Sequence, residues 1–153
     1  MIFVTADTHF GHHRVLQYGK RPFKDVERMD EELIHRWNQW VQPLDEVYHL
    51  GDVSFHKPDI TALILERING RIYLVRGNHD KTTANQCSAR FEWIKDYHVL
   101  KHEKKRYVLM HYPLLTWDRA HYGTFDHNTS AGRFQQRFLA ASQEWGMPFH
   151  RQL

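Results

Sequence analysis

Four short polar clusters, each directly after an apolar run typical of a β-strand, constrain this chain more than any other feature. They are Asp7-Thr8-His9, Gly51-Asp52, Gly77-Asn78-His79-Asp80 and His111, and the runs before them span residues 2–4, 47–50, 72–75 and 107–110. The carboxyl ends of strands in an α/β sheet open onto one edge, so residues far apart in sequence can meet there. Carboxylate, imidazole and amide groups all ligate divalent cations. The sequence therefore predicts a metal centre.

Strand-like and helix-like segments alternate along the chain. Strands are expected at residues 1–6, 46–50, 71–75, 97–100 and 106–110, and residues 7–27 are expected to form a loop. Apolar spacing predicts three helices. The first is capped by Asp30, the second starts at Pro58 with Ile60, Leu63, Ile64 and Ile68 on its apolar face, and the third spans residues 134–145. This alternation favours an α/β layered fold with a mixed sheet, because the last two strands look antiparallel.

Composition indicates an ordinary globular domain spanning residues 1–153. Hydrophobic residues make up 41% and charged residues 25% of the chain, and the formal charge of +3 is too mild to indicate a nucleic-acid partner. No apolar stretch approaches the roughly 20 residues that span a bilayer. The start of the chain does not resemble a signal peptide, and the lone Cys87 fits a reducing compartment. A cytoplasmic location away from membranes is therefore expected.

The chemistry of the clusters narrows the kind of metal site. Asp7 and His9 are two residues apart, and in an extended segment such side chains point the same way. The two oxygens of Asp52 can bridge two cations, while Asn78 offers an amide oxygen and His111 a second imidazole. Nitrogen and hard oxygen without thiolate favour Mn²⁺, Fe or Zn²⁺. Each cluster alone has an ordinary structural explanation, such as a turn or a buried histidine, but all four in order after strands do not.

Together with His111-Tyr112-Pro113, these motifs resemble the calcineurin-like metallophosphoesterase family over residues 1 to about 123. The segments Phe10-Gly11-His12 and Arg21-Pro22-Phe23 resemble a small bacterial and phage branch of that family. The resemblance implies a four-layer α/β/β/α sandwich with mixed sheets. It also implies a site for two divalent metal ions, of which Mn²⁺ is favoured and Fe, Zn²⁺ and Ni²⁺ are alternatives.

The resemblance also assigns roles. Asp7, His9 and Asp52 would hold one ion, and Asp52 would bridge to a second ion completed by Asn78 and His111. The implied reaction is hydrolysis of a phosphate mono- or diester by a metal-bound hydroxide, as in a phosphodiesterase or phosphatase. His79 would protonate or stabilise the leaving oxygen, with Asp80 orienting it. The alternative for Asp80 is the N-cap of a helix.

One part of the family pattern is missing. The family closes its site with Gly-His-x-His, and no such motif follows His111. Residues 124–153 therefore form a divergent tail, and three explanations stay open. His127, with or without His121 or Asp126, replaces a ligand; the tail folds differently and leaves open positions; or the sequence is truncated or altered relative to its relatives. A fold that is incomplete at this end would expose a sheet edge, which a homodimer would cover.

The substrate is less constrained than the metal site. We expect Asn78 and His79 to contact the phosphate ester, and the basic residues Arg14, Lys20, Arg21 and Arg119 to lie near the mouth of the site. Tyr112, with Trp117 and Tyr122, could stack on a base, which favours a nucleotide-like substrate. Solvated loops and ordinary packing are the alternatives for these residues.

A second hypothesis belongs to a different class. The missing motif fits a metal-binding or partner-binding domain on a phosphoesterase scaffold with weakened or lost catalysis. The intact Asn78-His79-Asp80 cluster argues against it. A third hypothesis is a nucleic-acid-binding module. Only the mild basicity and the aromatic content support it, because the sequence has no helix-turn-helix, zinc-finger or RNA-binding motif.

Overall fold

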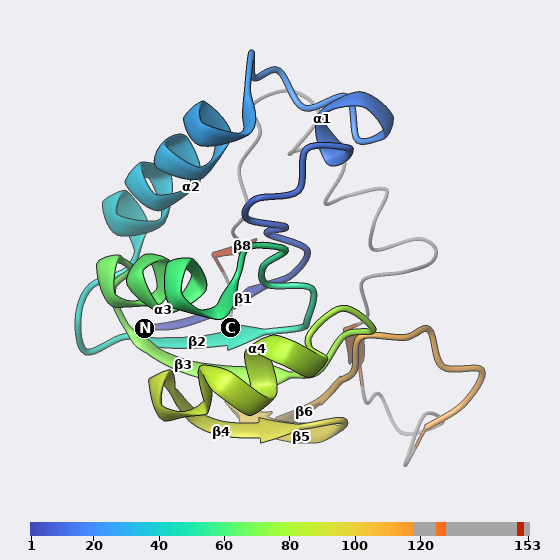
Figure 1. The fold of residues 1–153 in the computed structure, drawn as a ribbon. Coiled ribbons are helices and arrows are strands. Elements are labelled where there is room, and N and C mark those ends of the chain that lie inside the picture. Colours follow the sequence, from blue (N-terminus) through green and yellow to red (C-terminus); the bar gives the residue numbers. More distant parts are fainter. Residues whose placement is uncertain (118–124, 128–149, 152–153) are drawn as a thin grey trace.

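The computed structural model describes residues 1–117, 125–127 and 150–151, the last two segments as backbone. Its larger sheet contains β1 (Ile2–Thr5), β2 (Glu46–His49), β3 (Arg71–Val75), β4 (Phe91–Lys95) and β8 (His150–Arg151), in the order β4-β3-β2-β1-β8 (Figure 1). Strands β1 to β4 are parallel, and β8 is antiparallel to β1. The parallel strands place the carboxyl ends of β1, β2 and β3 along one edge.

A second, smaller sheet has the order β5-β6-β7. Strands β5 (His98–His102) and β6 (Lys105–Leu109) form an antiparallel hairpin, and β7 (Phe125–His127) runs parallel to β6. The hairpin turns at Glu103 and Lys104, which both have positive φ, as a tight two-residue turn requires. The sheets are therefore mixed, as expected.

Helices α2 (Val26–Trp40) and α3 (Pro58–Arg67) cover one face of the larger sheet, and α1 (Val15–Tyr18) and α4 (Lys81–Gln86) are short (Figure 1). Helix α2 begins earlier than expected. Its N-cap is Asp25, whose carboxylate accepts the Arg28 N–H at 2.8 Å, whereas Asp30 lies buried inside the helix. In α3, Ile64 and the following Ile68 are buried as expected, but Ile60 and Leu63 are exposed.

Two cores hold the layers together. The larger core lies between the helices and the five-stranded sheet and includes Phe3, Met29, Trp37, Leu65 and Leu74, each at most 1% exposed. The smaller core lies between the two sheets and includes Tyr48, Leu50, Leu100, Tyr107 and Leu109.

These cores confirm the expected α/β sandwich with mixed sheets. Three of its layers fall within the described residues, and the helix expected at 134–145 lies outside them.

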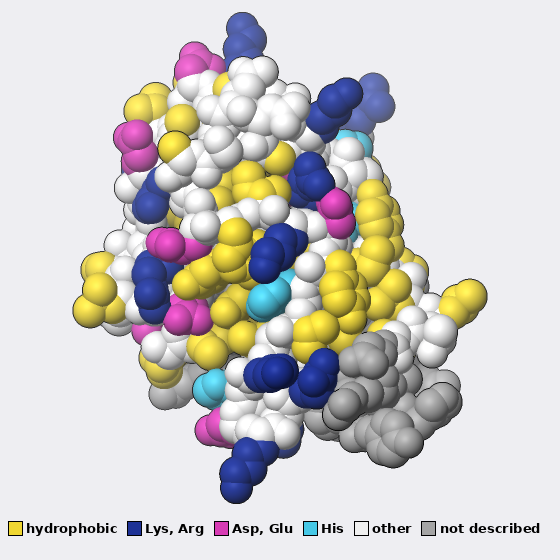
Figure 2. Space-filling view, turned by 90° about the horizontal axis from the view of Figure 1, so that it is seen from below, with side chains coloured by type: hydrophobic (Ala, Val, Ile, Leu, Met, Phe, Trp, Pro, Cys, Tyr) yellow, Lys and Arg dark blue, Asp and Glu magenta, His cyan; other side chains and the backbone are white. Residues whose placement is uncertain are grey.

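Seen from below, hydrophobic side chains gather in the middle of one face with Lys and Arg around them (Figure 2). The ring centroids of Trp93 on β4 and His98 on β5 are 4.7 Å apart, and Lys95 Nζ lies 4.6 Å from the centroid of the Trp93 ring. No helix in the described part of the chain is long and apolar enough to cross a membrane.

Candidate metal centre

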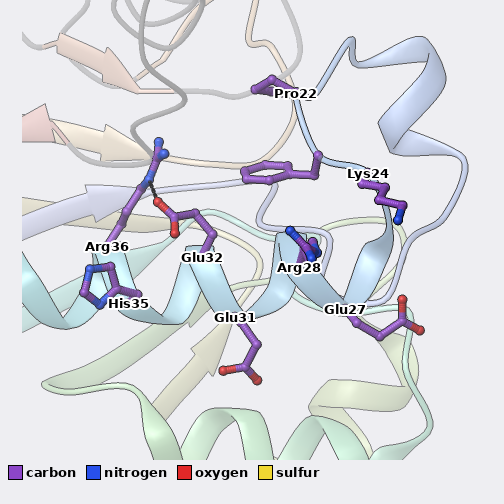
Figure 3. Close-up of a pocket in the computed structure, with 9 residues that line it drawn as sticks. Pro22, Lys24, Glu27, Arg28, Glu31, Glu32, His35 and Arg36 are labelled. Carbon is purple, nitrogen blue, oxygen red and sulfur yellow. Dashed lines mark hydrogen bonds and ion pairs between the residues drawn. The ribbon is translucent and has the colours of Figure 1, made fainter.

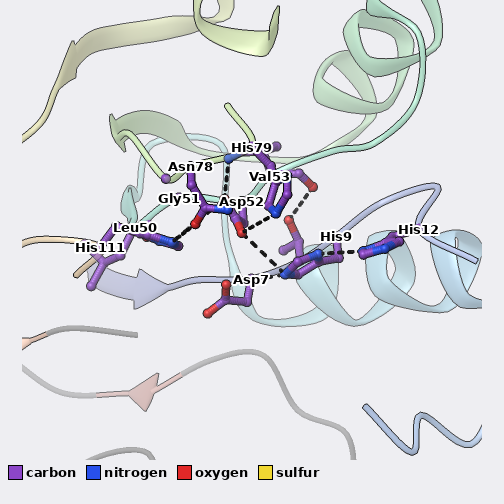
Figure 4. Close-up of polar contacts among 12 residues, drawn as sticks. Asp7, His9, His12, Leu50, Gly51, Asp52, Val53, Asn78, His79 and His111 are labelled. Carbon is purple, nitrogen blue, oxygen red and sulfur yellow. Dashed lines mark hydrogen bonds and ion pairs between the residues drawn. The ribbon is translucent and has the colours of Figure 1, made fainter. Parts of the chain in front are cut away.

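The residues that follow β1, β2 and β6 converge at the edge where the strands end. Asp7, Asp52 and His111 each offer one ligand atom, and these atoms all lie within 4.8 Å of one another. Figure 4 shows them with His9, Asn78 and His79 around the same space. The structure thus brings together donors separated by more than a hundred positions in the sequence.

The backbone at this edge is unusual, and it corrects the expectation that Asp7 and His9 lie in an extended segment. Asp7, His9 and Asp52 have φ values of 52°, 52° and 57°, in the left-handed region that non-glycine residues seldom adopt. Strand β1 ends at Thr5, and the chain then turns, although Asp7 N–H still donates to Gly51 O at 2.9 Å. Such backbone strain persists only where surrounding contacts enforce it, and it is concentrated at functional sites.

His9 faces the two carboxylates through one ring nitrogen. Its Nε2 lies 3.4 Å from Asp7 Oδ1 and 3.8 Å from Asp52 Oδ2. Asp52 itself is 4% exposed, so its carboxylate is nearly removed from solvent. Two buried or half-buried carboxylates beside a ring nitrogen form a donor set that suits a divalent cation.

His111 is held so that its Nε2 faces the site. Its Nδ1 lies 2.7 Å from Leu50 O, and because a carbonyl oxygen only accepts, Nδ1 carries the hydrogen. In the neutral ring Nε2 then presents a lone pair, 3.1 Å from Asn78 Oδ1 and 3.8 Å from Asp52 Oδ1. Three acceptor atoms therefore face one another, and all three could ligate a cation placed among them.

Two glycines allow the loops to approach this closely. A Cβ on Gly51 would lie 2.4 Å from Gly77 N, and a Cβ on Gly77 would lie 2.3 Å from Asp52 Oδ1. Gly51 also has a φ of 94°. The two loops can therefore meet only because neither position has a side chain.

His79 lies at the open side of the donors. Its ring Nε2 is 4.0 Å from Asp52 Oδ2, its backbone N–H donates to Asp52 Oδ1 at 3.0 Å, and its side chain is 48% exposed. Asn78 is also exposed. Both side chains are accessible to a substrate that reaches this edge.

Asp80 has a different role from the one expected. Its side chain is 0% exposed, and its carboxylate accepts backbone N–H groups from Asp52 (2.7 Å), Val53 (2.9 Å) and Gly77 (2.7 Å). It stands at the N-cap position of α4 but makes no side-chain cap bond there. Asp80 therefore joins two loops that carry candidate ligands through their backbones, and it occupies the N-cap position that the alternative gave it, without the capping hydrogen bond.

A buried histidine that sequence reasoning missed also joins the loops. His49 Nδ1 accepts the Gly51 N–H at 3.2 Å, so the hydrogen sits on Nε2, which donates to Thr8 Oγ1 at 3.0 Å. Thr8 Oγ1 in turn donates to Val53 O at 2.8 Å. Burial lowers the pKa of His49 to about 4, which keeps the ring neutral. The sequence feature that could have identified this residue is the presence of a histidine inside the apolar run 47–50.

An ion pair between the partly exposed His56 and the buried Asp30 fixes the loop that follows His9. His56 Nε2 lies 2.6 Å from Asp30 Oδ2, and Gly11 N–H donates to Asp30 Oδ1 at 3.0 Å. Burial raises the pKa of the Asp30 carboxyl. The loop is thereby attached to α2.

The basic residues expected at the mouth of the site differ in their burial and in their contacts. Arg21 donates to Thr8 O at 2.7 Å and to Asp7 O at 2.6 Å, so its guanidinium supports the first ligand loop rather than contacting a phosphate. Burial lowers the pKa of Arg21. Arg14 and Lys20 are exposed, and Arg119 lies outside the described residues.

Two further predicted residues lie close to β6. The exposed Tyr112 ring packs edge-on against His111, with 5.0 Å between ring centroids. The backbone of His127 pairs with Leu109, two residues before His111. The side chains of His127 and Asp126, and all of His121 and Tyr122, lie outside what the structure describes.

A groove on the outer face of α2 lies apart from these donors (Figure 3). Its lining includes three acidic residues, Glu27, Glu31 and Glu32, and three basic residues, Lys24, Arg28 and Arg36. Arg36 pairs with Glu32 at 2.6 Å, and Glu31 pairs with Arg67. The charges therefore balance locally, and the groove does not favour an anionic ligand.

Comparison with known proteins identifies the family. A family model described as the calcineurin-like phosphoesterase superfamily domain matches residues 1–139. The chain belongs to this superfamily, whose members usually bind divalent metals, and the Asp7, Asp52 and His111 cluster provides a candidate site for them.

Relatives of the chain extend to archaea and phages. An uncharacterised protein of Methanocaldococcus jannaschii is 36% identical over 114 residues, which are 73% of this chain and 58% of that protein. The gene 66 protein of Mycobacterium phage L5 is 40% identical over 80 residues, which are 50% of this chain and 38% of that protein. This chain thus spans about half the length of these relatives. Their names assign no activity.

A solved structure supports the fold. A protein of unknown function from Aquifex aeolicus superposes with a TM-score of 0.65 and 26% identity, covering 84% of this chain and 88% of its own. The similarity covers most of both chains and supports the arrangement of strands and helices seen in the described residues.

Proposed function

We propose that the protein is a metal-dependent phosphoesterase that hydrolyses a phosphate mono- or diester. The observation that supports this most is the convergence of Asp7, Asp52 and His111 within 4.8 Å, with the accessible His79 beside them. The family is generally one of hydrolytic phosphoesterases, which agrees with this chemistry.

Divalent cations bound here would supply an activated water and stabilise negative charge on the ester oxygens. In our proposal Asp7, His9 and Asp52 hold one ion, and Asp52, Asn78 and His111 hold the other. The mixture of imidazole nitrogen and carboxylate or amide oxygen makes Mn²⁺ the first ion to test. A side-chain ligand from His127 stays part of the proposal.

His79 is the residue we assign to the leaving oxygen. It is half-exposed, its Nε2 faces the donors, and a protonated imidazole there would donate to an oxygen leaving the phosphorus. Asn78 and Arg14 would bind phosphate oxygens, and the exposed Tyr112 ring would stack on a base. A nucleotide-like ester is therefore the substrate class that we propose, in a cytoplasmic enzyme.

Hydrolysis of aryl phosphate esters tests this assignment. Purified protein with Mn²⁺ should hydrolyse bis-p-nitrophenyl phosphate or p-nitrophenyl phosphate above the rate of the buffer with metal alone. His79→Asn should lower kcat by about 100-fold or more, the usual contribution of a general acid. His13→Asn is the matched control, because His13 is an exposed histidine to which no role is assigned.

The same assay separates the two functions considered. Metal binding without turnover on either ester would favour a binding domain with lost catalysis. Equal activity in wild type and His79→Asn would refute the role of His79.

A further inference from the structure

The second ring nitrogen of His9 has an uncommon partner. A histidine that ligates a metal through one nitrogen usually donates its other N–H to a carboxylate, a backbone carbonyl or a water. Here His9 Nδ1 lies 3.0 Å from Nδ1 of His12, while His9 Nε2 faces the carboxylates of Asp7 and Asp52 (Figure 4). The partner of this candidate ligand is therefore another imidazole.

The hydrogen positions follow from this geometry. His9 can ligate a cation through Nε2 only if Nε2 has a lone pair, so in the neutral ring the hydrogen must be on Nδ1. The atom across from it, His12 Nδ1, must then accept. His12 is accordingly the tautomer with hydrogen on Nε2, and the Tyr18 hydroxyl lies 3.2 Å from Nδ1 and 3.4 Å from Nε2 of this ring.

Local structure fixes the two rings against each other. The chain turns back at residues 9–12, where His12 N–H donates to His9 O at 3.1 Å. The turn needs Gly11, because φ is 75° there and a Cβ would lie 2.5 Å from the His56 ring.

Phe55 provides the surface on which both rings rest. It stacks on His12 with 3.8 Å between centroids and 20° between planes, and on His9 with 5.1 Å and 15°. The planes of the His9 and His12 rings differ by 27°, with 5.1 Å between their centroids. Phe55 thus keeps the two imidazoles side by side, with their Nδ1 atoms in contact.

We propose that His12 is a positioning residue for the metal centre, which selects the tautomer of His9 that leaves Nε2 free to ligate. This inference rests on the proposed metal centre and adds a residue that does not itself touch the metal or the substrate. It gives a physical reason for the His9-Phe10-Gly11-His12 sequence: a ligand, a tight turn and the acceptor that orients the ligand.

Three variants at position 12 separate this role from a general structural one. His12→Phe keeps a flat ring on Phe55 but removes the acceptor. His12→Asn can place its amide oxygen close to where Nδ1 was and so restore the acceptor. His13→Phe changes the exposed neighbouring histidine and is the matched control.

The first measurement is the tautomer of His9 in metal-free protein, read from the ¹⁵N shifts of its ring. Wild type and His12→Asn should show hydrogen on Nδ1, and His12→Phe should shift His9 toward the form with hydrogen on Nε2. The second is the affinity for Mn²⁺ by calorimetry. His12→Phe should weaken Mn²⁺ binding by about 10–100-fold, because losing the hydrogen-bond partner of a ligating histidine has an effect of this size. His12→Asn should recover the wild-type affinity.

The outcomes distinguish the two proposals. If wild type binds no Mn²⁺, the proposed metal centre is wrong and the role of His12 falls with it. If wild type binds Mn²⁺ and His12→Phe binds equally with an unchanged His9 tautomer, the metal centre stands and the inference about His12 is overturned. Weak binding in His12→Phe and His12→Asn alike, with the wild-type tautomer kept in both, would also overturn it.

Discussion

Asp80 shows how a buried charge can build a site without joining its chemistry. Both oxygens of its carboxylate are used by backbone N–H groups of the loops that contain Asp52 and Gly77. Hydrogen bonds to an ionised acceptor are shorter and about twice as strong as neutral ones. The carboxylate therefore sets the distance between two loops that carry candidate ligands.

Replacing Asp80 by Asn should destabilise the protein. The amide keeps one acceptor oxygen but turns an NH₂ group toward at least one backbone N–H, and a buried unsatisfied group costs about 1–3 kcal/mol. The free energy of unfolding from urea titration should fall by that amount, and Mn²⁺ affinity should fall with it. Asp59→Asn, at an exposed position of α3, is the control. A variant as stable as wild type would contradict this role.

His49 should make stability depend on pH. Burial depresses its pKa from 6.5 to about 4, so between these values the unfolded chain binds a proton that the folded protein excludes. The unfolding free energy should therefore rise as pH increases from about 4 to about 6.5, and this contribution should be constant above that range.

Urea titrations in EDTA across this pH range check the prediction. His49→Gln cannot titrate, so its stability deficit relative to wild type should shrink as pH falls. An identical pH slope in both proteins would show that His49 does not titrate on unfolding.

At the residue scale the sequence indicated the candidate ligands but not the residues that hold their loops in place. Asp7, His9, Asp52, Asn78 and His111 were identifiable because their side-chain chemistry is explicit and each follows a strand. The supports bond to backbone groups of distant loops, and such pairings depend on where those loops pass. Arg21, for example, looks like any basic loop residue until the carbonyls of Asp7 and Thr8 are found beside it.

At the scale of the elements, the loops after β1, β2 and β3 carry most of the candidate ligands. They contain three non-glycine residues with left-handed backbone and three glycines, Gly11, Gly51 and Gly77, that permit contacts a Cβ would block. Conformations of this kind cost about 1–3 kcal/mol each and survive only when neighbouring contacts enforce them. The loop set is therefore built as one interdependent unit.

Gly51→Ala tests that interdependence. The new Cβ would lie 2.4 Å from Gly77 N and 2.7 Å from His111 Nδ1, at a residue with a φ of 94°. We expect a loss of about 3–5 kcal/mol in unfolding free energy, in the range that strain and overpacking produce together. Circular dichroism during urea unfolding measures it, and a loss below about 1 kcal/mol would contradict the packing described.

Elements were predictable where apolar periodicity was strong. The strand at 71–75 matches β3 at both ends, but α2 begins at Val26 because Asp25 and not Asp30 provides its cap. Helix α4 was missed because its six residues bury only Thr83 and Ala84 and so have no apolar stripe. In α3, Thr61 is buried although it is partly polar, and Leu63 is exposed. Hydrophobicity alone predicts the opposite burial for these two residues.

At the scale of the whole molecule, the second sheet bears on oligomeric state. The homodimer expected from sequence required an open strand edge at the end of the fold. The backbone of β7 pairs with β6, so β6 is an inner strand. Strand β7 itself then lies at the edge of the small sheet, so the homodimer stays a prediction. Light scattering at high protein concentration should give twice the chain mass of 18.5 kDa, and a mass of 18.5 kDa would overturn the dimer.

The proposed function depends most on the metal centre being catalytic. The most direct test is the rate of bis-p-nitrophenyl phosphate hydrolysis as Mn²⁺ is added to metal-free protein, for wild type and Asp52→Asn together. We predict a rate that rises from background and saturates in wild type, and that stays at least about 100-fold lower in a folded Asp52→Asn variant. A rate that does not respond to Mn²⁺, Fe²⁺, Zn²⁺ or Ni²⁺, or one that Asp52→Asn leaves unchanged, would contradict the account.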